Sequence, residues 1–229
     1  MVAAGFLDSH PDLRHRKLGM AAYADNDHAL ALEHLRRAAR YGDKPSQALV
    51  AEMLWNGLGT AQDRVLGYVW MDLAAERGYA PFVTMRESYW SRLERAERLR
   101  VAAAGEAVYA DYGDAVAEPR LATVLRRARR NVTGSRTGMV GNVKILIPGP
   151  GGLEDDASSI DAATFYHPRY WDPVQYRAWQ DSIWMNPRLS TVTVGAASAA
   201  GTTTPATPVP PADAGEDTQP RPATAPPEG

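Results

Sequence analysis

The chain has 229 residues, of which 45% are hydrophobic and 23% are charged, an ordinary composition for a soluble globular protein of one or two domains. Its formal net charge of −2 gives no whole-molecule case for binding nucleic acid or an anionic membrane surface. Without cysteine the chain cannot form disulfides, use thiolate catalysis or bind a metal through cysteine, and no apolar run is long enough for a transmembrane segment.

The first residues give an expectation about location. Residues 1–7 are too short for a secretory signal and lack its basic region, so the sequence as written indicates a cytoplasmic protein. The first predicted helix begins close to Met1, without the polar cap that helical arrays usually carry. An export signal upstream of this start would instead make the protein exported or periplasmic.

Apolar residues at helical spacing predict two consecutive helix pairs. The helices of the first pair are expected at about 11–24 and 28–41, and those of the second at about 46–56 and 64–77. Residues suited to a first turn or an N-cap stand before or at three of these starts, namely Pro11, Asp27 and Asp63.

Small residues mark the ends and the crossings of the second pair. Gly57 and Gly59 can adopt the left-handed conformations that end one helix and turn the chain toward the next. Gly78 ends the second helix in the same way. Ala74 and Ala75 are small enough to let two helix backbones approach where they cross.

The two pairs are related by an internal repeat. Residues 18–45, shifted forward by 36 positions, match residues 54–81 at seven of 28 positions, against about two expected from composition. The matched pairs are Leu18 and Leu54, Asp27 and Asp63, Leu30 and Leu66, Ala38 and Ala74, Ala39 and Ala75, Gly42 and Gly78, and Pro45 and Pro81. Such repeats are typical of stacked helix pairs that present an extended surface to a partner.

The second unit, residues 48–78, carries the pattern of a known repeat. Its marker positions are Leu54, Gly57, Gly59, Asp63, Trp70, Ala74, Ala75 and Gly78. The stretch resembles the SEL-one-like repeat, a relative of the tetratricopeptide repeat with a longer turn between its helices, whereas the first unit has Ala21 and Tyr23 in place of the family's glycines. The resemblance implies a right-handed helical superhelix that serves as an adaptor or assembly scaffold, with no catalytic residue and no cofactor.

After the second unit the repeat pattern weakens while helical spacing continues. Residues 82–90 and 94–112 are expected to form the helices of a degenerate third unit, and Pro119 is expected to start a further helix running to about Arg130. We therefore predict an all-α solenoid of about three helix pairs over residues 8–130.

Residues 131–189 are expected to form a small irregular cap. Six glycines between positions 134 and 152 exclude a long helix, and residues 143–147 predict a strand that must pair or pack to be stable. The aromatic residues of 165–184 are expected to form an extended arm that covers the open edge of the last helix pair. Residues 190–229 are rich in Pro, Thr and Ala, which predicts a disordered tail.

Candidate catalytic and metal-binding groups are sparse. None of the five histidines forms the i, i+4 pair with an intervening glutamate of a zinc site, and the segment 134–138 matches neither a nucleophile elbow nor a phosphate loop. We therefore predict no catalytic, metal or cofactor-binding residue and no enzyme activity. The alternative is an enzyme or enzyme-regulatory module with its site in 131–189, where Ser135, Arg136 and His167 would have to converge.

A basic stretch over residues 120–144 holds seven cations and no acid. Arg126, Arg127 and Arg130 cluster at the end of a predicted helix, where cations complement the helix dipole. They could also pair with acids of a neighbouring helix, namely Glu94, Glu97 or Glu106. The remaining interpretation is an anionic partner, but nucleic acid is disfavoured because no aromatic base-stacking platform lies nearby in the sequence.

A protein or peptide is the partner that a solenoid fits best. Specificity is expected on the first helix of each pair, and Glu52, Trp55, Arg86 and Tyr89 are the predicted partner-binding residues of the concave face, although Trp55 could equally belong to the core. A rigid curved surface loses little entropy on binding, which favours a non-enzymatic scaffold or adaptor. A structural homo-oligomer formed through the aromatic block is the alternative, and the partner's identity and the oligomeric state stay open.

Overall fold

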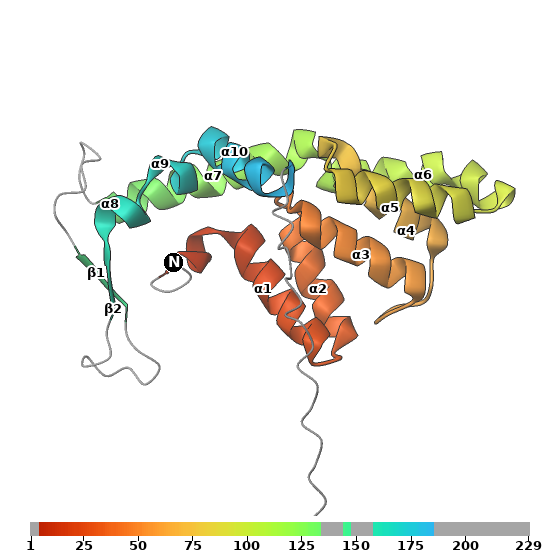
Figure 1. Cartoon of the computed structure of the whole chain (residues 1–229), viewed down its shortest axis with the longest axis horizontal. Coiled ribbons are helices and arrows are strands. Elements are labelled where there is room, and N and C mark those ends of the chain that lie inside the picture. The colour runs from red at the N-terminus through yellow and green to blue at the C-terminus, as the bar shows by residue number, and fades with distance from the viewer. Residues whose placement is uncertain (1–4, 134–143, 148–157, 186–229) are drawn as a thin grey trace, which may run out of the picture. The chain divides into compact units, whose positions relative to one another are not determined.

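The computed structural model describes residues 5–133, 144–147 and 158–185, which form helices α1–α10, two short 3-10 helices and one two-stranded sheet (Figure 1). These residues all lie in one compact unit of the chain. The predicted tail, residues 190–229, lies outside the described residues.

The first four helices form two packed pairs. Helices α1, Pro11–Ala24, and α2, His28–Ala39, pack against each other, as do α3, Lys44–Asn56, and α4, Arg64–Ala74. Helix α2 also packs against α3, which stacks one pair on the next. The prediction of consecutive helix pairs is confirmed, and the short 3-10 helix η2, Ala75–Arg77, continues α4.

Equivalent residues begin the second helix of each pair. The Asp27 side chain accepts a hydrogen bond from the backbone N–H of Leu30 at 3.1 Å, and the Asp63 side chain accepts one from Leu66 at 2.9 Å. Each bond satisfies a backbone donor that the first turn of a helix leaves without a partner. The sequence repeat is therefore a repeat of local structure.

The turns inside the two pairs differ. In the second pair Gly57 and Gly59 have φ angles of 73° and 69°, and a Cβ atom on Gly59 would lie 2.4 Å from the carbonyl group of His28. This turn therefore rests directly on the backbone of the first pair. In the first pair Asn26, with φ of 61°, supplies a left-handed residue in place of the glycines, because asparagine tolerates this conformation better than most residues.

Small and apolar side chains fill the space between the four helices. Ala38, Ala39 and Ala74 are fully buried, and Ala75 is nearly so. Larger side chains of the same core include Leu35, Val50, Met53, Leu54, Val69, Trp70 and Leu73. Burial of this apolar surface is the main term that holds the pairs together.

The helices of the third unit pack on the second unit rather than on each other, and the helix after them is longer than predicted. Helices α5, Ala80–Arg92, and α6, Arg95–Tyr112, both pack mainly against α4 rather than against each other. Helix α7 spans Asp114–Thr133, so the prediction that Pro119 starts this helix is wrong. A proline inside a helix costs one backbone hydrogen bond, and ion pairs made by Asp114 hold the added turn in place.

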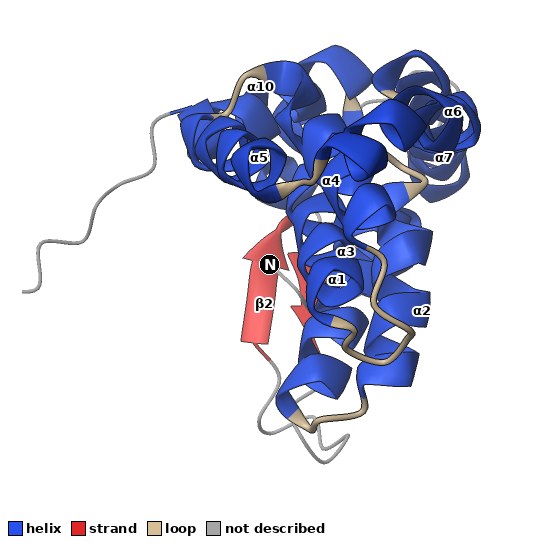
Figure 2. Ribbon diagram, turned by 90° about the vertical axis from the view of Figure 1, so that its right-hand side faces the viewer, coloured by secondary structure: helices blue, strands red, loops and turns tan. Residues whose placement is uncertain are grey.

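The predicted strand forms, and the aromatic block is helical. Strand β1, Lys144–Ile147, pairs antiparallel with β2, Ser158–Asp161, in the only sheet of the described residues (Figure 2). Helices α8, Ala162–Phe165, α9, Pro168–Trp171, and α10, Pro173–Met185, follow. The expected extended arm is therefore a set of helices, of which α9 and α10 pack along α7.

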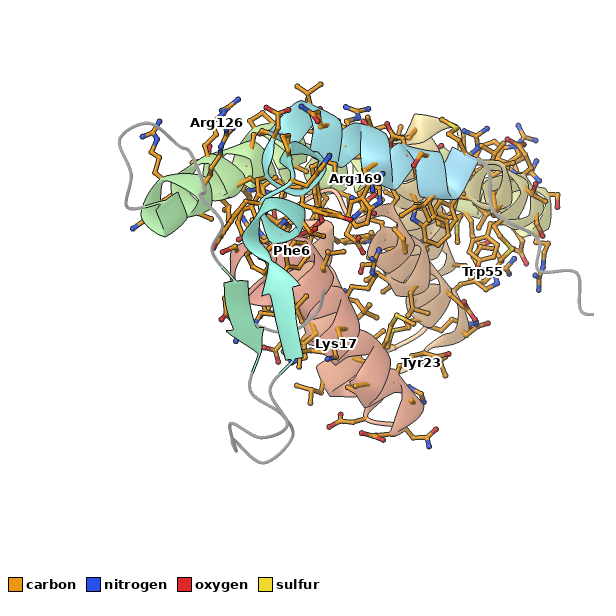
Figure 3. The ribbon with its side chains drawn as sticks, turned by 60° about the vertical axis from the view of Figure 1, so that its left-hand side comes forward. Phe6, Lys17, Tyr23, Trp55, Arg126 and Arg169 are labelled. Carbon is orange, nitrogen blue, oxygen red and sulfur yellow. The ribbon has the colours of Figure 1, made fainter. Side chains whose placement is uncertain are left out.

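The C-terminal helices also cover the start of the first pair. Phe6 lies just before the 3-10 helix η1, Leu7–Ser9, and is buried with Phe165, Tyr170 and Trp171 in a second apolar cluster (Figure 3). Trp184, near the end of α10, packs instead against Phe82 of α5. Residues from both ends of the described chain thus form the cap. The cap had been predicted to cover only the last helix pair.

Candidate functional site

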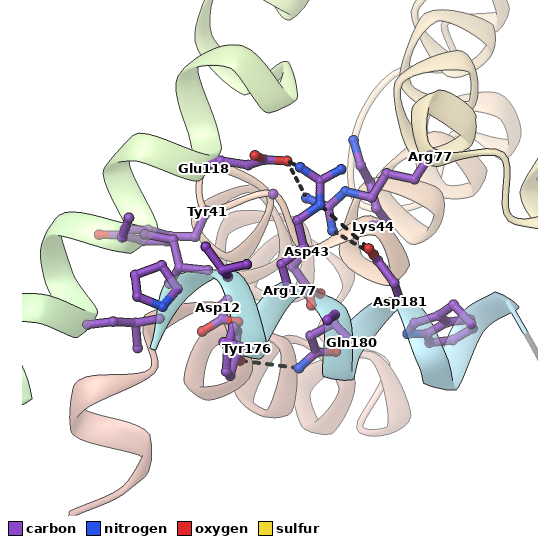
Figure 4. Close-up of a pocket in the computed structure, with 18 of the residues that line it drawn as sticks. Asp12, Tyr41, Asp43, Lys44, Arg77, Glu118, Tyr176, Arg177, Gln180 and Asp181 are labelled. Atoms are coloured by element: carbon purple, nitrogen blue, oxygen red, sulfur yellow. Dashed lines mark hydrogen bonds and ion pairs between the residues drawn. The ribbon is translucent and has the colours of Figure 1, made fainter. Parts of the chain in front are cut away.

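The turns that join the helix pairs face α7 and α10 across a groove of about 560 Å³, which we call the edge groove (Figure 4). Its walls come from residues 41–45, 77–79, 118–126 and 173–184, together with Asp12 of α1. Pockets of this size bind small ligands or the side chains of a peptide.

A short repeated sequence builds one side of this groove. Tyr-Gly-Asp occurs at residues 41–43 before α3 and again at residues 112–114 at the start of α7. The Gln47 side-chain amide joins the two turns, because it donates to the carbonyl oxygen of Ala39 at 3.3 Å and to that of Tyr112 at 3.1 Å. The turns of different units are therefore held at one edge.

Lys44 lies in the wall of the groove with no solvent-exposed side-chain surface. Its ammonium donates to the carbonyl oxygen of Leu73 at 2.9 Å and to the Glu76 carboxylate at 2.8 Å, and it lies 3.1 Å from the Asp114 carboxylate. Burial lowers the pKa of Lys44, although Asp114 and Glu76 act in the opposite direction. The buried cation thus ties the start of α3 to the end of α4, to η2 and to the start of α7.

Arg77 forms the second half of this ion-pair network. Two of its guanidinium nitrogens donate to the two carboxylate oxygens of Asp114, each at 2.8 Å. Burial alone would raise the pKa of Asp114, but the hydrogen bonds from Arg77 and the charge of Lys44 hold it below its ordinary value of 3.8. A planar bidentate pair of this kind fixes geometry as well as charge.

Helix α10 is attached to the same edge by polar contacts. Arg177 pairs with Glu118 of α7, and the Tyr79 hydroxyl donates to Asp181, which also lies 3.8 Å from Arg77. Burial raises the pKa of Tyr79 to about 12, and its hydrogen bond to Asp181 contributes to the rise. The groove wall on this side is therefore a helix held by hydrogen bonds and ion pairs.

Asp12 is the most unusual polar group of the groove. Its carboxyl is 3% exposed, and one oxygen accepts a hydrogen bond from the Tyr176 hydroxyl at 2.5 Å. The other oxygen, Oδ1, has no hydrogen-bond partner among the described residues. Burial raises the pKa of Asp12 above 3.8, and the Asp43 carboxylate adds to the rise. Burial and the Asp12 charge also hold the pKa of Tyr176 well above 10.0.

His10 lies behind Asp12 and joins the two ends of the described chain. Its ring nitrogens lie 2.8 Å from the carbonyl oxygen of Phe6 and 2.7 Å from that of Tyr170. The imidazole is fully buried and stacks on the Phe6 ring. Because both nitrogens face backbone oxygens, His10 fixes α9 against the start of α1.

Two of the predicted partner-binding residues are buried. Trp55 and Tyr89 are 5% and 3% exposed, and their rings stack with a centroid distance of 4.0 Å. Burial raises the pKa of Tyr89 to about 12, and the charge of the nearby Glu52 adds to the rise. Arg86 lies apart from them, paired with Asp72 at 3.4 Å. The Trp55 and Tyr89 rings thus hold α3 against α5 and offer little surface to a partner.

The predicted basic cluster lies on the exposed end of α7 (Figure 3). Of its three arginines only Arg126 lines the edge groove, at the rim. Within the described residues, none of the three forms an ion pair with Glu94, Glu97 or Glu106, and the nearest cation to Glu97 is Arg64 at 3.8 Å. Their anionic partner remains a prediction.

The residues of the alternative enzyme site are only partly described. His167 is exposed, and its ring accepts a hydrogen bond from the backbone N–H of Arg169 at 3.2 Å. Ser135 and Arg136 lie outside the described residues. In the aromatic block of the homo-oligomer alternative, Tyr170 and Trp171 are buried within the chain, whereas Tyr166, Trp179 and Trp184 are partly exposed. This alternative stays a prediction.

Three residues of the groove, Asp12, Lys44 and Tyr176, were not predicted from the sequence to be site residues. The repeated Tyr-Gly-Asp was the available signal, since it marks two turns that meet at the groove. Nothing in the sequence pairs Asp12 with Tyr176, because the two residues are 164 positions apart. In the described part of the chain, no group of three or more metal-ligating side chains is found, and no helix is long and apolar enough to cross a membrane.

Comparison with known proteins gives one structural match. No protein-family model matches the chain, and no curated protein matches it. A protective antigen from uropathogenic Escherichia coli that displays an SLR fold is similar over 58% of this chain, with a TM-score of 0.43 and 19% sequence identity. The match spans 27% of the length of that protein.

Proposed function

We propose that this chain is a non-enzymatic helical-repeat scaffold that binds a protein or peptide partner in the edge groove. The edge groove itself is the observation that supports this function, because its volume of about 560 Å³ lies in the range of binding pockets. The proposal moves the partner site away from the concave-face residues Trp55 and Tyr89, whose rings are buried.

The walls of the groove are fixed before any partner arrives. Lys44, Arg77 and Asp114 form a buried ion-pair network on one side, and α10 is tied down on the other. A site of this kind loses little conformational entropy on binding, so more of the contact energy appears as affinity.

The groove combines apolar surface with converging polar groups. Leu121 and Leu125 of α7 and Val174 of α10 line it, and Val174 is 78% exposed at the rim. Trp184 lies at the far end of the same wall. Hydrophobic and aromatic side chains with a few placed polar groups are typical of binding pockets.

Site-specific photo-crosslinking in the full chain tests this proposal. A crosslinking amino acid at Val174, on the groove rim, is compared with the same amino acid at Leu99 of α6, because both native side chains are 78% exposed and Leu99 does not line the groove. We expect a discrete product from position 174 that is lost when Ala178→Trp fills the groove. Equal products from both positions, or a product from 174 that persists with Ala178→Trp, would overturn the proposal.

A further inference from the structure

Apart from Arg126, which is exposed at the rim, the charged groups that line the edge groove are paired with one exception. Three cations of the lining have carboxylate partners: Lys44 with Glu76 and Asp114, Arg77 with Asp114, and Arg177 with Glu118 and Asp181. The exception is Asp12, which lines the groove and whose Oδ1 atom is buried and has no hydrogen-bond partner among the described residues. A buried polar atom without a hydrogen bond costs stability, so the site favours a donor that reaches it.

Neighbouring side chains do not supply this donor, although the backbone N–H of Leu13 lies close enough to the carboxyl to lower the pKa of Asp12. The Asp43 carboxylate is itself bonded to Arg16 at 2.9 Å and to the hydroxyl of Ser46 at 2.6 Å. Both ring nitrogens of His10 face backbone carbonyl oxygens. The Tyr176 hydroxyl donates to the other oxygen of Asp12. The two side chains lie side by side in Figure 4.

We propose that the edge groove takes a primary alkylammonium group, such as the lysine side chain of a partner protein, with its nitrogen on Oδ1 of Asp12. The methylene stem then lies against the apolar residues of the groove, among them Leu121, Ala122 and Leu125. This inference rests on the proposed scaffold function and names the chemistry of the partner at that site.

The geometry favours an ammonium over a guanidinium or a neutral group. Asp12 has one free oxygen, so it cannot receive the two parallel hydrogen bonds with which arginine binds a carboxylate. A compact point charge on an apolar stem suits a single acceptor at the end of a largely apolar groove. Arg126 at the rim is exposed, so solvent and salt screen its repulsion of an entering cation.

Proton release is a second consequence. Burial and Asp43 raise the pKa of Asp12, and the other groups facing it are Tyr176, His10 and the backbone N–H of Leu13. An ammonium favours the ionised carboxyl, so its binding lowers the pKa of Asp12. In the pH range over which Asp12 titrates, the affinity for the cation therefore rises with pH and binding releases a proton.

The test uses n-hexylammonium, 1-hexanol and hexanoate as probes of the full chain by isothermal titration calorimetry. We expect n-hexylammonium to bind about tenfold more tightly than 1-hexanol, the difference made by one charge-assisted hydrogen bond, and hexanoate to bind more weakly than either. This comparison needs no substitution, so it holds even if a variant fails to fold. Equal binding of the ammonium and the alcohol would overturn the inference.

Two variants test whether Asp12 is the group that binds n-hexylammonium. Asp12→Asn keeps the shape of the side chain and is expected to reduce n-hexylammonium binding to that of 1-hexanol. Asp72→Asn is the matched control, because Asp72 also accepts a tyrosine hydroxyl bond, from Tyr109 at 2.8 Å, but does not line the groove. Unchanged binding by Asp12→Asn would overturn the inference, while the crosslinking at Val174 tests the scaffold function separately.

Discussion

The body formed by α1–α4 and the edge where α10 docks are held together in different ways. In the body, apolar side chains and small residues bury continuous surface, and backbones touch where Gly59 meets His28. At the edge, α10 is attached through hydrogen bonds and ion pairs around a groove of about 560 Å³, in addition to the packing of Trp184 on Phe82. Apolar burial therefore stabilises the body, whereas the edge keeps one buried carboxyl oxygen, Asp12 Oδ1, without a partner among the described residues.

This division suits a repeat protein. Stacked helix pairs bury their shared face and gain stability from nearest neighbours, so every position inside the stack is constrained by packing. The turns between the pairs are also buried, but they hold polar side chains that are paired with one another. In this chain those turns carry Lys44 and Asp43, and the groove beside them holds Asp12.

The largest expected effect comes from a substitution in the body, at the backbone contact between Gly59 and His28. Gly59→Ala requires a left-handed alanine and places a Cβ atom 2.4 Å from the His28 carbonyl, so we expect a loss of about 3 kcal/mol in the free energy of unfolding. Gly78→Ala is the matched control, because Gly78 has a φ of 72° but no atom within 4 Å of the added Cβ.

For Gly78→Ala we expect only the conformational cost, about 1 kcal/mol. Urea unfolding of both variants followed by circular dichroism measures the difference. Equal losses in the two variants would show that the contact between the units contributes nothing.

A smaller effect is expected at the edge. Tyr176→Phe removes the donor to Asp12 and leaves both carboxyl oxygens without a partner, so we expect a loss of about 1–2 kcal/mol. Tyr109→Phe removes the same kind of bond to Asp72, which is 35% exposed and can bond to water instead, so its cost should be about 0.5 kcal/mol.

Hydrogen exchange of the α10 amides, together with urea unfolding, measures both changes. We expect faster exchange in α10 for Tyr176→Phe, with α2 and α3 protected as in the unsubstituted chain. The same exchange rates in α10 for both variants would contradict the role given to the Tyr176 bond.

The smallest expected effect is on the pH dependence of the free energy of unfolding, to which two aspartates contribute with opposite signs. The folded chain raises the pKa of Asp12 above 3.8, so this group opposes folding increasingly as pH rises from 3.8 through its folded pKa. The pKa of Asp114 is lowered, so its contribution is present above 3.8 and is lost as pH falls through its folded pKa.

Each group changes the free energy of unfolding by at most about 1.4 kcal/mol per pH unit. Urea unfolding of the unsubstituted chain, Asp12→Asn and Asp114→Asn between about pH 3 and pH 7 separates the two slopes. Slopes of the same sign for the two substitutions would be inconsistent with the environments described for these carboxyls.

The body could be predicted because its signals are local. Asp27 and Asp63 cap helices, and Gly57 and Gly59 turn the chain, through contacts within a few residues. The prediction that Pro119 starts a helix was wrong, because proline suits a first turn. Nothing nearby in the sequence shows that Asp114, where the helix begins, is held by Arg77.

The cap and the groove could not be predicted for a related reason. The aromatic block was expected to be an extended arm, whereas Pro168 and Pro173 within it each begin a helix, a position that proline favours. The groove depends on contacts between Asp12 and Tyr176, at opposite ends of the described chain. Composition and spacing carry no information about such pairs.

An experimental structure of the full chain with bound n-hexylammonium tests the central claim most directly. The account predicts the nitrogen within hydrogen-bonding distance of Asp12 Oδ1, with α1–α4 unchanged and the alkyl chain between α7 and α10. A probe bound only outside the groove, or Asp12 Oδ1 bonded instead to a side chain of the protein itself, would contradict it.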